Sequence, residues 1–306
     1  MKIVFMGTPE FAVPSLNILY QNGYDIVGVI TATDKMGGRG NKKLIQSAIK
    51  KYAVEKGLKV LQPKNLKAPE FVEELRSLKA DLQLVVAFRM LPEVVWNMPP
   101  IGTINLHGSI LPAYRGAAPI HWAVINGETE TGVTTFFLKH EIDTGDVLMC
   151  EKMPIGLDDT TGNVHDRMME LGAKTVLASV QKIESGNYEL TPQDDSKVSK
   201  APKLKREICR INFDQPTKKV YDFIRGMSPF PTAWTKLYNE PLKVLKAQPI
   251  ITEHSHLPNT FVTDNKNYIR IATQDGYINV EKLQMQGKRK MNVKDFLNGY
   301  KLKPTE

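Results

Sequence analysis

Residues 101–108 read IGTINLHG, an apolar run that ends in two polar side chains. The run Ile101–Leu106 predicts a buried strand, because short apolar runs of this length are typical of buried strands. Successive side chains of a strand point to opposite faces, so Asn105 and His107 are expected on one face and Leu106 on the other. We therefore expect an amide and an imidazole side by side at the end of a buried strand.

This pair of side chains is suited to attack on a carbonyl group. The Asn can donate a hydrogen bond to an oxyanion, and the His can accept a proton from a nucleophile. No Ser or Cys stands in a nucleophile elbow here, so the attacking group is expected to come from a substrate. A lone His is more often structural, but the nearby Asn105 and the turn Asp143-Thr144-Gly145 favour catalysis. Asp143 could orient His107 or support its charged form, and Asp146 is an alternative for that role.

Strand and helix signals alternate over residues 1–185. The alternation predicts a doubly wound, Rossmann-like parallel sheet, in which ligands bind beyond the carboxyl ends of the strands. The expected strands are residues 2–6, 26–31, 82–87, 101–106, 132–138 and 147–153, and the expected helices are residues 11–21, 42–56, 69–78, 119–126 and 160–185.

The last third of the chain has a different pattern. Residues 186–203 contain Gly186, Thr191-Pro192, Asp194-Asp195-Ser196 and Ala201-Pro202, a composition that predicts a linker. Residues 204–306 are expected to form a second domain, a small β-barrel, because short strand signals alternate there with Gly, Pro and Asn. The expected elements are a helix at residues 216–226 and strands at residues 233–238, 243–247, 260–263, 269–272 and 277–283.

The net charge of +8 is unevenly distributed. Residues 1–203 hold 23 basic and 23 acidic side chains, whereas residues 204–306 hold 18 basic and 10 acidic ones. Such asymmetry favours a polyanionic partner, although a merely soluble basic domain is the plainer alternative. The clusters Lys288-Arg289-Lys290 and Lys218-Lys219 contribute to the excess.

Several classes of protein are disfavoured by composition. No apolar run approaches membrane-spanning length, and the apolar start of the chain is too short for a signal peptide. The two cysteines, Cys150 and Cys209, suggest neither zinc binding nor a disulfide framework. We therefore expect a cytoplasmic protein without membrane contact.

A combination of motifs resembles the folate-dependent formyltransferase family. The motifs are Asn105-x-His107, the loop SILP at 109–112, RGAAP at 115–119, DTG at 143–145, the start GTPEFA at 7–12 and the basic loop GRGNKKL at 38–44. The resemblance covers nearly all 306 residues. It implies a catalytic domain at residues 1–185, a linker at 186–203 and a barrel of the oligonucleotide-binding (OB) type at 204–306.

The resemblance also implies roles for individual residues. It assigns catalysis to Asn105, His107 and Asp143, and so prefers Asp143 to Asp146. In the family the loop after the catalytic strand helps bind the folate, which corresponds here to Ser109, Ile110, Leu111 and Pro112. The basic loop meets the acceptor end of a tRNA, which corresponds here to Arg39, Lys42 and Lys43. The pterin-pocket segment, AFRMLP at 87–92, is one residue shorter than usual and has Arg89 in place of a glycine.

The full-length resemblance, with its basic second part, is to family members that act on initiator methionyl-tRNA. It implies transfer of a formyl group from 10-formyltetrahydrofolate to the α-amine of methionine, by a protein expected to be monomeric. No metal is expected, because the nucleophile is a free amine and the leaving nitrogen can be protonated.

Three alternatives remain open from the sequence. A formyltransferase of the same family could act on glycinamide ribonucleotide or on an amino sugar nucleotide. A nicotinamide oxidoreductase could share the topology, but Gly7-Thr8-Pro9 lacks the G-x-G-x-x-G spacing of dinucleotide sites. A non-catalytic RNA-binding protein would not require Asn105, His107 and Asp143 together.

Overall fold

The computed structural model describes residues 1–38, 40 and 43–302. Contacts divide the chain into two compact units. Unit 1 comprises residues 1–119, 131–153 and 165–200, and unit 2 comprises residues 120–130, 154–164 and 201–306. Two short segments from the middle of the chain, residues 120–130 and 154–164, thus cluster with its last third.

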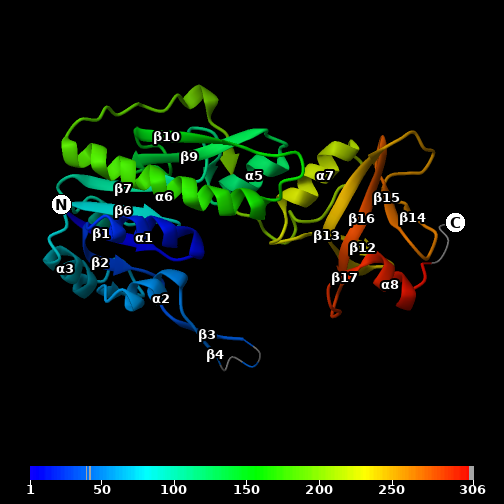
Figure 1. Cartoon of the computed structure of the whole chain (residues 1–306), viewed down its shortest axis with the longest axis horizontal. Helices are drawn as coiled ribbons and strands as arrows, with labels where there is room; N and C mark the ends of the chain where they lie inside the picture. The colour runs from blue at the N-terminus through cyan, green and yellow to red at the C-terminus, as the bar shows by residue number, and fades with distance from the viewer. Residues whose placement is uncertain (39, 41–42, 303–306) are drawn as a thin grey trace. The chain divides into compact units, whose positions relative to one another are not determined.

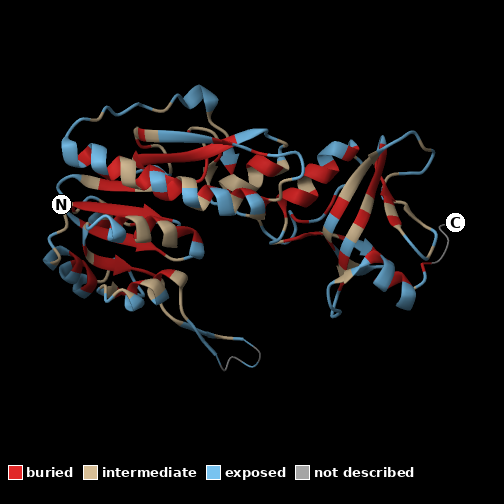
Figure 2. Ribbon diagram, in the orientation of Figure 1, coloured by how far each residue is buried: buried red, intermediate tan, exposed pale blue. Residues whose placement is uncertain are grey.

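Unit 1 is built on a seven-stranded sheet in the order β10-β9-β7-β6-β1-β2-β5 (Figure 1). Its strands are β1 (Lys2–Gly7), β2 (Asp25–Ile30), β5 (Val60–Leu61), β6 (Leu82–Val86), β7 (Gly102–His107), β9 (Glu130–Phe137) and β10 (Val147–Pro154). The central strands are parallel, and most of their side chains are buried (Figure 2). The predicted strand at 101–106 is confirmed, shifted by one residue.

Helices cover this sheet. They are η1 (Glu10–Ala12), α1 (Val13–Gln21), α2 (Ala48–Glu55), α3 (Pro69–Ser77), α4 (Glu93–Trp96) and α6 (Thr161–Ser185), whose first turn clusters with unit 2. Helix α6 packs closely on β7 and β9. A Cβ on Gly172 would lie 2.7 Å from a methyl of Leu106, and the hydroxyls of Thr135 and Ser179 are hydrogen-bonded at 2.7 Å. Because Leu106 faces α6, its neighbours Asn105 and His107 face the other side of the sheet.

The sheet is not fully parallel, although the alternation of strand and helix signals predicted a parallel sheet. Strand β9 runs antiparallel to β7, with Asn105 opposite Phe136 and His107 opposite Thr134. The segment between them contains α5 (Pro119–Ile125), but residues 120–130 cluster with unit 2. A parallel neighbour would need a crossover connection within unit 1, whereas an antiparallel one does not.

A second correction concerns the predicted helix at 42–56. Residues 43–45 instead form β4 (Lys43–Ile45), which pairs with β3 (Lys35–Gly37) in a hairpin. Helix α2 begins only after Ser47, whose hydroxyl caps it by accepting a hydrogen bond from Lys50 N at 3.0 Å. The predicted helix is thus confirmed only from residue 48 onward, and Leu44 and Ile45 in the hairpin are about half exposed.

Unit 2 contains an open antiparallel sheet with the geometry of a half-barrel. Its strands follow the order β12-β13-β16-β15-β14, with β17 paired to β16. The strands are β12 (Ala233–Leu237), β13 (Glu240–Ile251), β14 (Phe261–Thr263), β15 (Ile269–Ala272), β16 (Gly276–Met285) and β17 (Met291–Asn292), and the helices are α7 (Thr217–Gly226) and α8 (Val293–Gly299). One apolar core joins both helices to the sheet. The prediction of an α/β domain followed by a barrel-like antiparallel domain is confirmed.

Short elements complete the chain. Strands β8 (Arg115–Gly116) and β11 (Lys200–Ala201) pair with each other, and η3 (Asp195–Lys197) lies in the predicted linker. Within the described residues, every helix is too short or too polar to cross a lipid bilayer.

Candidate active site

Strand β7 presents Asn105 and His107 at its carboxyl end, on the face opposite α6. His107 is 6% exposed and Asn105 is half-buried. Within the part of the chain that the structure describes, the Asn105 amide has no hydrogen-bond partner, so its N–H groups can serve a ligand. The parallel neighbours β1 and β6 end at the same edge of the sheet, where ligands of α/β sheets bind.

Two groups flank the His107 imidazole. Its Nε2 lies 2.9 Å from the carbonyl oxygen of Tyr114, and its Nδ1 lies 3.8 Å from Oδ2 of Asp143. A carbonyl oxygen only accepts hydrogen bonds, so Nε2 carries a proton. In the neutral ring Nδ1 is then the basic nitrogen. At 3.8 Å the Asp143 carboxylate is too far for a hydrogen bond but close enough to stabilise a charged imidazolium.

Asp143 reaches this position because its loop folds back over the sheet. The loop leaves β9 beside the first residues of β7, where Leu138 N donates a hydrogen bond to Thr103 O. It then folds back along β7, so that Asp143 lies beside His107 at the last residue of that strand. The Asp143 carboxylate accepts a hydrogen bond from Gly116 N at 2.9 Å. Gly145 closes the loop, since a Cβ there would lie 1.6 Å from Phe137 O. The alternative residue, Asp146, instead pairs with Lys139 at 2.8 Å.

The loop Ser109–Pro112 follows β7 directly. Ser109 is fully buried, and its hydroxyl donates to Ala113 O at 2.6 Å. Leu111 is also buried, and its N–H donates to the Thr134 hydroxyl at 3.1 Å. Ile110 and Pro112 are partly exposed. Ser109 and Leu111 therefore fix the shape of the loop, whereas Ile110 and Pro112 are accessible to a ligand.

Residues 1–180 match the formyl transferase family, and residues 203–301 match the C-terminal domain of formyl transferases. The chain belongs to the formyl transferase family. It is 51% identical to a methionyl-tRNA formyltransferase of Parabacteroides distasonis, over 98% of this chain and 96% of the relative. It is 48% identical to a methionyl-tRNA formyltransferase of Flavobacterium johnsoniae, over 98% and 96% of the two chains.

Solved structures of other formyl transferases share the fold. The N-formyltransferase of Helicobacter canadensis, in complex with folinic acid and dTDP-3-aminofucose, matches with a TM-score of 0.69 at 22% identity, over 92% of this chain and 98% of that one. A glycinamide ribonucleotide transformylase of Symbiobacterium toebii matches only 63% of this chain, with a TM-score of 0.54 at 16% identity.

The shortened segment after β6 departs from the usual formyl transferase pattern at Arg89. Its guanidinium donates hydrogen bonds to the carbonyl oxygens of Pro63 and Lys64 and lies 5.7 Å from the centre of the Phe88 ring. The exposed Arg89 is therefore held by the segment before α3.

Of the basic loop expected to contact a tRNA, only part can be described. Arg39 and Lys42 lie outside the described residues, and Lys43 is exposed at the start of β4. The β3–β4 hairpin carries three exposed apolar side chains, Met36, Leu44 and Ile45.

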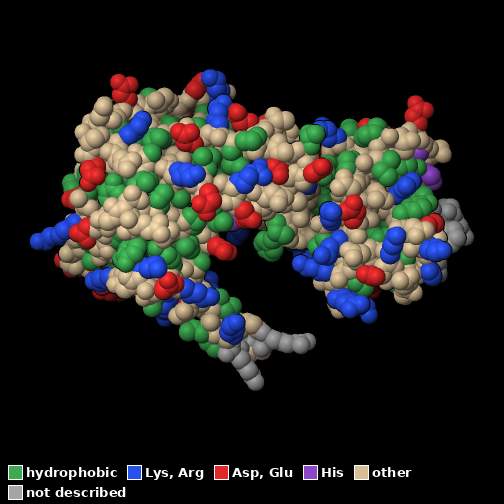
Figure 3. Space-filling model, in the orientation of Figure 1, with side chains coloured by type: hydrophobic (Ala, Val, Ile, Leu, Met, Phe, Trp, Pro, Cys, Tyr) green, Lys and Arg blue, Asp and Glu red, His purple; other side chains and the backbone are tan. Residues whose placement is uncertain are grey.

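Lys and Arg side chains gather on the visible face of unit 2 (Figure 3). Lys288, Arg289 and Lys290 lie in the exposed turn between β16 and β17 and, within the described ranges, pair with no carboxylate. Lys218, in contrast, is bound to Asp222 at 2.7 Å. The three-residue turn is therefore the more available of the two clusters.

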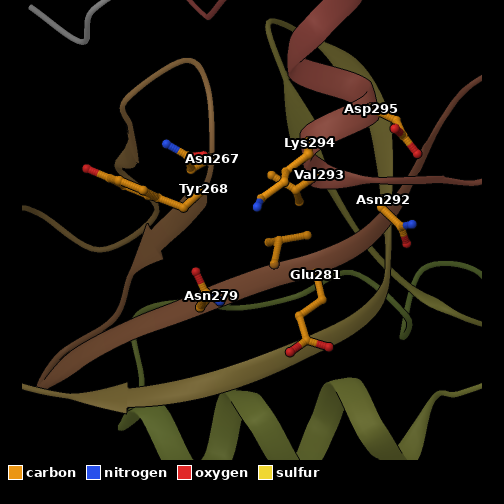
Figure 4. Close-up of a pocket in the computed structure, with 9 residues that line it drawn as sticks. Asn267, Tyr268, Asn279, Glu281, Asn292, Val293, Lys294 and Asp295 are labelled. Carbon is orange, nitrogen blue, oxygen red and sulfur yellow. The ribbon is translucent and has the colours of Figure 1, made fainter.

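Unit 2 also contains a hollow of about 350 Å³ between the residues just before β15, strand β16 and the start of α8 (Figure 4). Its labelled lining includes Tyr268, Lys294 and the carboxylates of Glu281 and Asp295. The mixed charges do not form the uniformly positive surface that phosphate groups favour. None of the residues discussed as catalytic lines it.

The sequence did not indicate two groups that shape this active site. One is the backbone carbonyl of Tyr114, which no side-chain motif can reveal. The other is Gln193, in the predicted linker, whose Nε2 donates to Asp143 O at 2.9 Å and to Gly145 O at 2.8 Å. An isolated Gln in a polar segment carries no signal of its own.

Proposed function

We propose that this protein transfers the formyl group of 10-formyltetrahydrofolate to the α-amine of methionine on initiator methionyl-tRNA. The proposal rests on the near full-length similarity to relatives named methionyl-tRNA formyltransferase. The site supports it, because the amide of Asn105 and the buried imidazole of His107 lie together at the end of β7. We assign no side chain there as the nucleophile, as expected if the attacking amine comes from the substrate.

In the proposed reaction the neutral α-amine attacks the formyl carbon. A new C–N bond forms, and the formyl oxygen becomes an oxyanion that accepts a hydrogen bond from Asn105. Nδ1 of His107 takes a proton from the amine, and the carboxylate of Asp143 stabilises the resulting imidazolium. The bond to the folate nitrogen then breaks, and His107 returns the proton to that nitrogen. The proton lost by the amine is thus gained by the leaving group.

The remaining roles follow the same proposal. The loop Ser109–Pro112 lines the folate site through Ile110 and Pro112, while Ser109 and Leu111 hold its shape. Residues 1–185 are the catalytic domain, residues 186–203 the linker and residues 204–306 the OB-like tRNA-binding domain. Arg39, Lys42 and Lys43 contact the acceptor end of the tRNA. The protein acts as a monomer in the cytoplasm.

The test is a formylation assay with competing acceptors. Methionyl-initiator tRNA, glycinamide ribonucleotide and a dTDP-amino sugar are offered together with 10-formyltetrahydrofolate, and uncharged tRNA serves as the control. We expect product only on the charged tRNA. Formylation of a small amine instead would keep the chemistry and overturn the assigned acceptor, and no transfer to any acceptor would overturn the function.

The turn Lys288–Lys290 gives a further testable prediction. Replacement of Lys288, Arg289 and Lys290 by Gln is expected to weaken tRNA binding by about tenfold at physiological salt. The slope of log K against log salt should fall by roughly one for each phosphate that the protein no longer neutralises. Filter binding or fluorescence anisotropy over a salt series measures both quantities.

A matched control removes the same charge from unit 1. Lys51, Lys67 and Lys182 are exposed, and their replacement by Gln should leave tRNA affinity within about twofold. Equal losses in the two triple variants would show that only net charge matters and that the β16–β17 turn is not a contact surface.

A further inference from the structure

The two residues that flank His107 share an unusual backbone conformation. Tyr114 has φ +62° and Asp143 has φ +57°, both in the left-handed region. For residues other than glycine this conformation costs about 1 kcal/mol or more, so surrounding contacts must maintain it. The carbonyl of Tyr114 and the carboxylate of Asp143 are placed beside the imidazole by these two strained residues.

Both residues are hydrogen-bonded to the same segment, residues 191–199, which we call the strap. Ser199 accepts a hydrogen bond from Tyr114 N through its hydroxyl, at 2.9 Å. Gln193 donates to Asp143 O and Gly145 O, at 2.9 and 2.8 Å. Upstream, Thr191 pairs with Val147 at the start of β10. The strap therefore contacts both loops that bring groups to His107.

Gln193 connects the two loops through one side chain. Its Oε1 accepts from Nε and Nη2 of Arg115, at 3.0 and 2.8 Å, and Arg115 directly follows Tyr114. The amide nitrogen of Gln193 thus donates hydrogen bonds to the Asp143 loop, and the amide oxygen accepts hydrogen bonds from Arg115. Glu cannot replace it without loss, because a carboxylate has no N–H to donate to the two carbonyl oxygens. Gln193 is half-buried between exposed neighbours, in keeping with a side chain that points into the site.

We propose that Gln193 is a positioning residue for the transfer reaction. It holds the Asp143 loop folded back over β7 and ties it to the Tyr114–Arg115 loop, which keeps His107 oriented and its charged form stabilised. In this role Gln193 acts through its bonds to the Asp143 loop and to Arg115, and not through contact with a substrate. The inference rests on the proposed function, because its effect is measured on formyl transfer.

The test compares Gln193→Met, which retains the size of the side chain, and Gln193→Glu, which retains only the acceptor for Arg115. We expect kcat to fall roughly ten- to a hundredfold in both, as small displacements of catalytic groups do. KM for 10-formyltetrahydrofolate and for methionyl-tRNA should stay within about twofold, because binding groups are untouched. Ser196→Ala, in the same strap, removes a hydroxyl that, among the described residues, bonds only Asp194, and it should behave as the unaltered protein.

A double mutant separates positioning from folding. In an Asp143→Ala background, Gln193→Met should lower kcat by less than about threefold, since the carboxylate that Gln193 positions is already gone. The inference would be overturned if Gln193→Met lowered kcat by the same factor in the Asp143→Ala background as in the unaltered protein. It would also be overturned if kcat of Gln193→Met were unchanged, or if its lower activity came entirely from KM or from a smaller folded fraction. If the unaltered protein formylates no methionyl-tRNA, the proposed function fails first, and the two failures are thereby distinguished.

Discussion

Replacement of His107 by Ala is expected to reduce formyl transfer by roughly 10²–10⁴-fold, the usual contribution of a general acid or base. The variant loses the imidazole that lies between the Tyr114 carbonyl and the Asp143 carboxylate. The α-amine then has no group to receive its proton, and the folate nitrogen has none to supply one. Single-turnover transfer to methionyl-tRNA measures the loss.

Binding should survive in this variant, because His107 is buried and lies outside the basic surfaces. tRNA affinity, measured by anisotropy, is expected within about twofold of that of the unaltered protein. The matched control is His140→Ala, in the same β9–β10 loop as Asp143 but three-quarters exposed. It should retain full activity. Transfer by His107→Ala at close to the original rate would show that another group moves the proton.

Asn105 carries the second large effect. Asn105→Ala is expected to lower kcat by roughly 10²–10³-fold, the cost of removing one donor to a developing oxyanion. Asn105→Asp should be at least as slow, because a carboxylate has no hydrogen-bond donor and repels the oxyanion. The test is kcat under saturating folate and tRNA. KM should change little, since the hydrogen bond strengthens only as the oxyanion forms.

Loss of folding would not explain such a result. The Asn105 side chain is half-buried and, within the described residues, makes no hydrogen bond, so its truncation breaks none inside the protein. The melting temperature of Asn105→Ala should therefore match that of Asn187→Ala, an exposed control beyond the end of α6. A kcat of Asn105→Ala within about threefold of the original would remove Asn105 from the oxyanion site.

Local patterns predicted the elements that carry the site. The apolar run before Asn105 became β7, and the short strands of the last third became an antiparallel sheet. Within the helix predicted at residues 42–56, local patterns held at residues 48–55, which form α2, and failed at residues 43–45, which form a strand of an exposed hairpin. They also failed at β9, because the direction of a strand depends on where the preceding helix packs, and residues 120–130 pack with unit 2.

The pairing of Asn105 with His107 and the positive charge of residues 204–306 follow from the amino-acid order alone. Alternation along a strand and the sum of charges are local or additive properties, which need no knowledge of the fold. The surroundings of the imidazole, in contrast, depend on the folded chain. The Tyr114 carbonyl is a backbone group, and Asp143 and Gln193 reach the site through loops that fold back from distant points in the chain. Their positions depend on many weak contacts formed together. The DTG motif indicated Asp143 through the family resemblance, but no pattern of residue types indicated Gln193 or the Tyr114 carbonyl.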